Sequence, residues 1–291
     1  MSTKPFKTLD EQVELLKSRG LKISNIEAAK SILLRNNYYR LSGYSLTLRS
    51  HDQFYNNVFF ENIVDIYQFD QTLRHILLEF LEVIEITVKS VYAYEFTKRY
   101  GPLGYLDHNN FSDDDKHAEI VEKAKQQMNA RLPHEAYLKH YYELEEDIPL
   151  WAYVDLLTIS DISFLIKISD SQLQEIVALD IGLNKRGSDL LPRFMHSMTI
   201  LRNLCAHGSR LFNRLFEQKP WLSKSELSVL ITNKDGTKDN AHLFSYILIM
   251  RRMLSQQDFN DMKNQILNLI KKHPFVNMLH YGFPENWSTQ L

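Results

Sequence analysis

The feature that most constrains this chain is a long amphipathic stretch from Glu61 to Arg99. Its apolar residues recur at steps of three, four and seven, which is the spacing of one face of an α-helix: Ile66, Leu73, Leu77, Leu81, Ile84 and Val88. A helix over this range carries an apolar stripe along most of its length. Other elements have to cover such a stripe, because a helix cannot bury its own apolar face. The stretch therefore favours a bundle of helices.

The rest of the chain follows the same helical spacing. Only nine glycines and eight prolines interrupt 291 residues, and we find no convincing β-alternation beyond short pieces. Near the N-terminus, Thr8-Leu9-Asp10-Glu11 fits a capping box, Gly20 fits a helix end and Asn25 fits the cap of the next helix. The helix that follows Asn25 is predicted to end near Asn36. Further helices are predicted over 112–131, 134–145, 149–168, 171–179, 188–216, 241–256 and 258–272. A turn is predicted within 232–240 and an irregular tail after Pro274. The predicted fold class is all-α.

Composition excludes several classes of protein and site. The most apolar long segment, Ile76–Tyr94, is interrupted by four charged residues, so we expect no membrane-spanning helix and no membrane partner. The first nine residues contain no apolar signal core, which makes the cytoplasm the expected compartment. Cys205 is the one cysteine, so neither an internal disulfide nor a cysteine-based zinc site is expected.

Cofactor and metal sites also lack support in the sequence. Glu79, Glu82 and Glu85 lie along one predicted helix, but no Glu-x-x-His motif stands on a facing helix to complete a di-metal site. There is no P-loop and no Gly-x-Gly-x-x-Gly fingerprint for nucleotide phosphates. We therefore expect neither a metal nor a cofactor.

Charge is segregated along the chain, although the formal net charge is only −2. Residues 1–50 contain nine Lys or Arg and four Asp or Glu, whereas residues 111–147 contain five and ten. Residues 190–216 contain four arginines and two histidines and no acid. The overall balance argues against a uniformly basic nucleic-acid coat, but this distribution leaves room for a local basic patch.

Residues 201–214 carry the strongest functional signal. On an ideal helix, one stripe is a core face: Leu201, Leu204, Gly208, Leu211 and Leu215. A second stripe, about 100° away, is polar: Asn203, His207, Arg210 and Arg214. Arg202 points nearly opposite the core stripe. The predicted helix thus buries one face and presents an imidazole among guanidinium groups on another.

An imidazole beside guanidinium groups suits chemistry on phosphate. Guanidinium groups bind phosphate oxygens and stabilise added negative charge, and histidine moves protons near neutral pH. In RNA the 2′-OH is an internal nucleophile, so such a site needs no metal. A lone histidine on a helix more often packs or forms a hydrogen bond, so the spacing by itself leaves a structural role for His207 open.

Four blocks in this order resemble the Abi-like (AbiD/AbiF) abortive-infection proteins of the HEPN superfamily. The first is Arg202-Asn203-Leu204-Cys205-Ala206-His207, followed by Arg210-Leu211-Phe212-Asn213-Arg214. The others are Asn37–Tyr44, Phe69–Arg74 leading to Ile84-Glu85, and, more weakly, Ile148–Trp151. One residue departs from the pattern, since Gly208 stands where relatives often carry a polar residue, commonly histidine.

The resemblance implies a fold, an activity and an assembly. The fold is a HEPN-like helical bundle with additional N-terminal and inserted helices: an extension over 1–60, the helical domain over 61–273 and the tail over 274–291. The activity is metal-independent endoribonuclease cleavage in anti-phage defence. Two Arg-x4-His motifs meet at a homodimer interface, Arg202 and His207 carry catalysis, and Asn203 orients or contacts the site.

RNA contacts are predicted around the motif and near the N-terminus. On the motif side the candidates are Arg210, Asn213 and Arg214. On the N-terminal side they are Tyr39 and Arg40, because aromatic rings stack on bases and cations hold phosphates. The alternative interpretation is that Tyr38, Tyr39 and Tyr44 fill a helix junction, and this is the commoner role for tyrosines at such spacing.

Two other functions remain open at this point. The chain could be a non-catalytic module that holds a structured noncoding RNA on its Arg and His stripe. It could instead be a protein-interaction subunit of a toxin–antitoxin pair, with the basic patch binding an acidic partner.

Overall fold

A single long helix, α4, forms the axis of the molecule. The computed structural model describes residues 5–183 and 186–291, and all further statements concern these residues. Helix α4 runs from Phe60 to Tyr100, and its 41 residues extend about 60 Å at 1.5 Å per residue. It ends where Gly101 adopts a φ of +82°, a conformation that favours glycine. Every apolar residue of the predicted stripe is at most 2% exposed.

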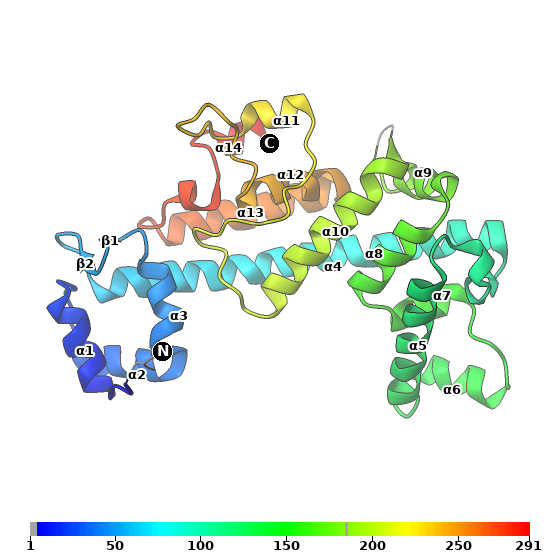
Figure 1. Ribbon diagram of the computed structural model, residues 1–291, viewed down its shortest axis with the longest axis horizontal. Helices are drawn as coiled ribbons and strands as arrows, with labels where there is room; N and C mark the ends of the chain where they lie inside the picture. Colours follow the sequence, from blue (N-terminus) through cyan, green and yellow to red (C-terminus); the bar gives the residue numbers. More distant parts are fainter. Residues whose placement is uncertain (1–4, 184–185) are drawn as a thin grey trace.

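Four helices pack along α4, as Figure 1 shows. Their bounds are α9 Ser171–Asp180, α10 Gly187–Ala206, α12 Leu243–Met253 and α13 Gln256–Lys272. Helix α12 is buried on nearly all sides, as expected of a central helix. The all-α prediction is confirmed, because strands in the described residues are limited to one short hairpin.

The N-terminal residues form a small lobe at one end of α4. It contains α1 Leu9–Ser18, α2 Ile26–Asn36, α3 Tyr38–Ser42, the 3-10 turn η1 Gly43–Ser45, and the strands β1 Arg49–Ser50 and β2 Gln53–Phe54. Thr8 forms the predicted capping box with Glu11, and the side chain of Asn25 caps α2. The hairpin was not predicted, because its two strands are too short to show alternation.

A second lobe occupies the other end of α4. It contains α5 Asp114–Arg131, α6 Ala136–Glu143, α7 Leu150–Tyr153 and α8 Ile159–Ile168, with 3-10 turns η2 Gly104–Leu106, η3 His108–Asn110 and η4 Val154–Leu156. The single helix predicted over 149–168 is wrong. It divides at η4, and Thr158 begins a new helix with its own capping box. Helix α5 is capped by Asp113, one residue after the expected Ser112.

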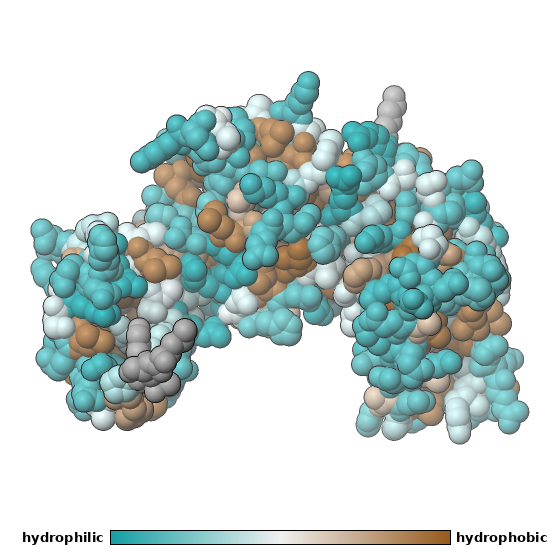
Figure 2. Space-filling view, in the orientation of Figure 1, coloured by the Kyte–Doolittle hydropathy of each residue, from teal (hydrophilic) through white to brown (hydrophobic). Residues whose placement is uncertain are grey.

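The two lobes project from the same side of α4 and give the molecule the shape of an arch. Figure 2 shows the open side of the arch between two mostly hydrophilic lobes. The C-terminal end of α10 lies near this open side, about midway between the lobes (Figure 1). Among the described helices, none has both the length and the apolar character that crossing a lipid bilayer requires.

The C-terminal tail packs into the core, and its predicted irregularity is only partly correct. It contains the 3-10 helix η5 Met278–Tyr281 and the short helix α14 Trp287–Gln290, and the preceding region holds α11 Lys224–Val229. Tyr281 is fully buried, and Phe283 and Trp287 are at most 6% exposed. The tail therefore contributes to the same apolar core as α4.

Candidate active site

Helix α10 ends at Ala206, so the helix predicted over 188–216 is ten residues too long. Gly208 adopts a φ of +64° and terminates the helix. The amide of Ser209 donates to the Leu204 carbonyl at 2.9 Å, and the amide of Gly208 donates to the Cys205 carbonyl at 3.1 Å. This pair of bonds is a Schellman motif, which glycine favours because it lacks a Cβ.

Because α10 ends early, the two stripes predicted for an ideal helix do not continue beyond Ala206. Leu211 is buried as predicted, but Leu215 is 68% exposed. Arg210 and Arg214 lie in the loop that follows the helix and so do not continue the Asn203 and His207 face. The motif itself is intact, because Arg202 and Asn203 lie in the last turns of α10 and His207 is its C-terminal cap.

His207 is exposed at the end of α10. Its backbone amide donates to the Asn203 carbonyl at 3.0 Å, which fixes the Cα position. Its imidazole forms no hydrogen bond or ion pair with the described residues. The ring is therefore available to a ligand.

Arg202 lies near an acid that the linear sequence does not place beside it. Its Nε is 4.0 Å from Oε2 of Glu85 on α4, and its Nη1 is 3.4 Å from Oδ1 of Asn203. Glu85 also pairs with Lys89 at 2.8 Å. The stretch 190–216 contains no acid in sequence, but α4 supplies one in space. The Arg202 side chain is 38% exposed, so it faces both α4 and solvent.

The loop after α10 is anchored by a second acid of α4, Asp70, which is fully buried. Its carboxylate accepts hydrogen bonds from the backbone amides of Leu211, at 3.2 Å, and Phe212, at 2.8 Å. It also pairs with Arg74 one turn further along α4. A residue more than 140 positions away in sequence therefore fixes the segment directly after the motif.

Two tyrosines complete the surroundings of Asp70. The hydroxyl of Tyr44, from the N-terminal lobe, donates to it at 2.8 Å, and that of Tyr281, from the tail, donates at 3.1 Å. Burial raises the pKa of the Asp70 carboxyl, and Arg74, Tyr44 and the two backbone amides oppose that shift. Asp70 thus connects α4, the N-terminal lobe, the motif loop and the tail.

The loop residues predicted to bind RNA differ in their surroundings. Arg210 donates to the carbonyls of Phe212 and Asn213, and its side chain packs against Gly43. Asn213 has a φ of +47°, and its amide donates to the His280 carbonyl at 2.9 Å. The guanidinium of Arg214 lies 5.9 Å from the ring centre of Phe216. All three residues are half-buried, and Arg210 supports the loop through its bonds to two loop carbonyls.

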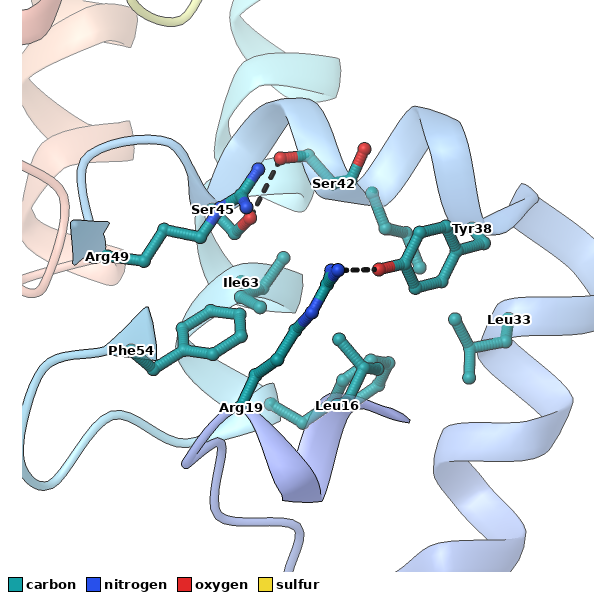
Figure 3. A pocket seen from close by; sticks show the side chains of 11 residues that line it. Leu16, Arg19, Leu33, Tyr38, Ser42, Ser45, Arg49, Phe54 and Ile63 are labelled. Carbon is teal, nitrogen blue, oxygen red and sulfur yellow. Dashed lines mark hydrogen bonds between the residues drawn. The ribbon is translucent and has the colours of Figure 1, made fainter. Parts of the chain in front are cut away.

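The N-terminal lobe reaches the motif through Arg40. Its Nη1 donates to the Gly208 carbonyl at 2.9 Å, next to His207. Arg40 and Tyr39 are exposed, whereas Tyr44 is buried and the hydroxyl of Tyr38 accepts a bond from Arg19 (Figure 3). Tyr38 and Tyr44 therefore pack at a helix junction, as the alternative interpretation expected. Tyr39 and Arg40 face solvent.

A small, partly enclosed cavity lies behind α3, between α1, α2 and the hairpin. Figure 3 shows Arg19 extending across it to Tyr38, with Phe54 and Ile63 among the other lining side chains. Ser45 donates to the Ser42 carbonyl at 2.8 Å at its edge. These contacts hold α3, and with it Arg40, in place beside the end of α10.

The sequence predicted no role in this site for Asp70 or Glu85, although both stand in the blocks that carry the family resemblance. An Asp and an Arg at i and i+4 on an otherwise apolar stripe are a usable signal of a buried pair. Nothing in the spacing shows that this pair receives the loop after His207. No group of three or more His, Cys, Asp or Glu side chains suited to a metal occurs in the described part of the chain.

Comparison with known proteins adds one finding. The family model described as Abi-like protein matches residues 31–213. The match begins in α2 and ends in the loop after α10, so it includes Arg40, Asp70, Arg202 and His207. No curated protein and no solved structure matches the chain.

Proposed function

The chain belongs to the Abi-like protein family, whose model spans residues 31–213 of its 291, and from this premise we propose a function in chemical terms. Membership points to a role in abortive infection. We propose that the chain performs it as a metal-independent endoribonuclease of HEPN type. Arg202 and His207 are the catalytic residues of the proposal, and Asn203 orients Arg202.

The observation that carries the proposal is the composition of the surface at the end of α10. An unengaged imidazole, that of His207, lies within two turns of the half-exposed guanidinium of Arg202. Arg40 adds a second guanidinium, bonded to the carbonyl of the residue after His207. Cations of this kind bind phosphate oxygens, and a free imidazole transfers protons.

The proposed reaction uses the 2′-OH of the RNA as nucleophile. His207 accepts the hydroxyl proton, O2′ bonds to the adjacent phosphorus, and the bond from phosphorus to O5′ breaks. The leaving O5′ takes a proton from an imidazolium. Arg202 stabilises the negative charge that accumulates on the phosphoryl oxygens. The products are a 2′,3′-cyclic phosphate and a 5′-OH end.

We propose that two copies of the chain form the complete site. The reaction needs one imidazole as base and one imidazolium as acid, and each chain offers one exposed histidine in the motif. Closing two motifs against each other also removes water, which strengthens the electrostatic contribution of Arg202. Around this centre, Arg214, Asn213, Arg40 and Tyr39 contact the RNA, and Arg210 contributes by holding the loop.

Cleavage of RNA by purified protein tests the proposal. Arg202→Ala is expected to lower the rate by about a hundredfold or more, and Arg202→Lys to restore only part of it, because lysine lacks the bidentate geometry. Arg193→Ala, an exposed arginine on the same helix, is the control. Cleavage should continue in EDTA. Products with a 3′-OH, or loss of activity in EDTA, would refute the proposed chemistry.

Copurification experiments identify the other two functions. RNA that copurifies without being cleaved would identify a module that holds RNA. A protein partner that remains bound after RNase treatment would identify an interaction subunit of a toxin–antitoxin pair.

A further inference from the structure

A hollow in the surface lies beside Arg40, where α2 ends and α3 begins. It is an open depression with a volume of about 620 Å³. Its lining is Leu34, Arg35, Asn36, Asn37, Tyr39, Arg40 and Tyr67. None of these described lining residues is acidic, so the electrostatic character of the hollow comes from its two arginines.

Several polar groups of the hollow have hydrogen-bonding atoms without a partner among the described residues. Arg35 is exposed and forms no hydrogen bond or ion pair with the described residues. Asn36 donates its amide nitrogen to the Ile32 carbonyl, which leaves Oδ1 free to accept. Asn37 accepts from the Tyr39 amide with Oδ1, which leaves its nitrogen free to donate. The hollow thus offers guanidinium groups together with a donor and an acceptor.

Tyr39 supplies an exposed aromatic ring at the same place. It is 67% exposed, although an aromatic ring of this size gains free energy from burial. The ring of Tyr38 lies nearly perpendicular to it, with 5.8 Å between the two ring centres. A flat aromatic face beside guanidinium groups is suited to stacking on a nucleobase.

Arg40 joins the hollow to the motif. It lines the hollow and also donates to the Gly208 carbonyl at 2.9 Å. Arg40 therefore links the hollow to the residue that follows His207.

We propose that this hollow binds one unpaired nucleotide of an RNA strand, with its base stacked on Tyr39 and its phosphate held by Arg35 and Arg40. Asn36 and Asn37 contact the base edge through their free amide groups. The substrate is therefore single-stranded or looped RNA, because the bases of a duplex are stacked inside it and cannot reach Tyr39. The inference rests on the proposed function only for what happens at His207, and the binding site stands separately.

Direct binding measurements test the subsite. The probe is a fluorescently labelled single-stranded RNA of mixed sequence, compared with the same strand annealed to its complement, and the full chain carries His207→Ala to prevent turnover. Tyr39→Ala is expected to weaken single-strand binding by about tenfold, and Tyr39→Phe to retain it, because stacking needs the ring and not the hydroxyl. Arg35→Ala should weaken binding and reduce its dependence on salt.

Two control variants match these changes elsewhere on the surface. Tyr142→Ala removes another exposed tyrosine, and Lys125→Ala another exposed cation, both from the second lobe. Both should bind as the parent does. The subsite is refuted if Tyr39→Ala binds single strands like the parent, if Tyr142→Ala weakens binding equally, or if duplex binds as tightly as single strand.

The outcome separates the subsite from the catalytic proposal. Weakened binding in Tyr39→Ala together with full cleavage by His207→Ala would support the subsite and refute the catalytic assignment. Abolished cleavage in His207→Ala with unchanged binding in Tyr39→Ala would support the catalytic assignment and refute the subsite.

Discussion

At the scale of single residues, Asp70 determines where the motif loop lies. Its carboxylate receives two backbone amides, two tyrosine hydroxyls and a guanidinium in a fully buried position. The contact between Asp70 and the Leu211 amide spans 141 positions in sequence. Periodicity places Asp70 on α4, but only the packed structure shows which distant backbone it bonds.

Removing the charge of Asp70 should destabilise the fold strongly. Asp70→Asn leaves Arg74 buried without its anionic partner, and loss of one member of such a pair costs about 3–5 kcal/mol. The free energy of unfolding, measured by urea denaturation, reports the loss. Asp261→Asn, an exposed acid on α13, should change it by less than about 0.5 kcal/mol. An Asp70→Asn protein that unfolds at the same urea concentration as the wild type would contradict this account.

Cys205 should be unreactive in the native protein. Burial raises the pKa of the Cys205 thiol to about 12 from the usual 9.0, so its thiolate fraction near neutral pH is about a thousandfold lower. Alkylation by iodoacetamide should be slow for native protein and fast in urea. Because the native pKa is the higher one, this group stabilises the fold fully below pH 9, and that contribution declines as pH rises toward 12. Equal alkylation rates in both states would disprove the burial of this thiol.

At the scale of elements, Gly208 determines the geometry of the motif. It ends α10 directly after His207 and keeps the imidazole at a helix terminus instead of on a helix face. The glycine was visible in the sequence. The prediction of a helix over 188–216 failed because the apolar spacing of Leu204 and Leu211 continues across this stop signal.

Gly208→Ala should therefore destabilise the end of α10. A Cβ at this position would meet only Arg40, at an ordinary contact distance of 3.6 Å, so the cost comes from the positive φ and amounts to about 1 kcal/mol. Gly208→Asn should cost less, because asparagine tolerates this conformation better. Urea denaturation of the two variants provides the comparison. Equal stability of Gly208→Ala and wild type would argue against the Schellman end.

Other elements differ in how well spacing predicts them. The sequence places α4 at 61–99, within one residue of its observed ends, because its apolar stripe is long and regular. The hairpin at Arg49–Phe54 and the division at η4 could not be predicted, since each depends on a few residues whose conformation is fixed by neighbours. Capping residues such as Thr8 and Asn25 were predictable because they act within one turn.

At the scale of the whole molecule, the arch brings two distant parts of the chain to the end of α10. Arg40 approaches from the N-terminal lobe and bonds to Gly208, while Tyr281 approaches from the tail and bonds to Asp70. These contacts join segments more than 150 positions apart, so no local pattern could have shown them. The sequence did predict the exposed Arg and His residues of the motif as candidates, because residue type and spacing carry that information.

The most direct test of the central claim compares two exposed histidines of the same segment. His196 is exposed on α10 and His207 ends that helix, so a substitution to alanine changes the surface similarly at either position. We predict that His207→Ala lowers the single-turnover rate of RNA cleavage by about a hundredfold or more, as expected on removal of a general base. His196→Ala should cleave at the wild-type rate. Cleavage by His207→Ala at the wild-type rate would contradict the assignment of this motif as a ribonuclease site.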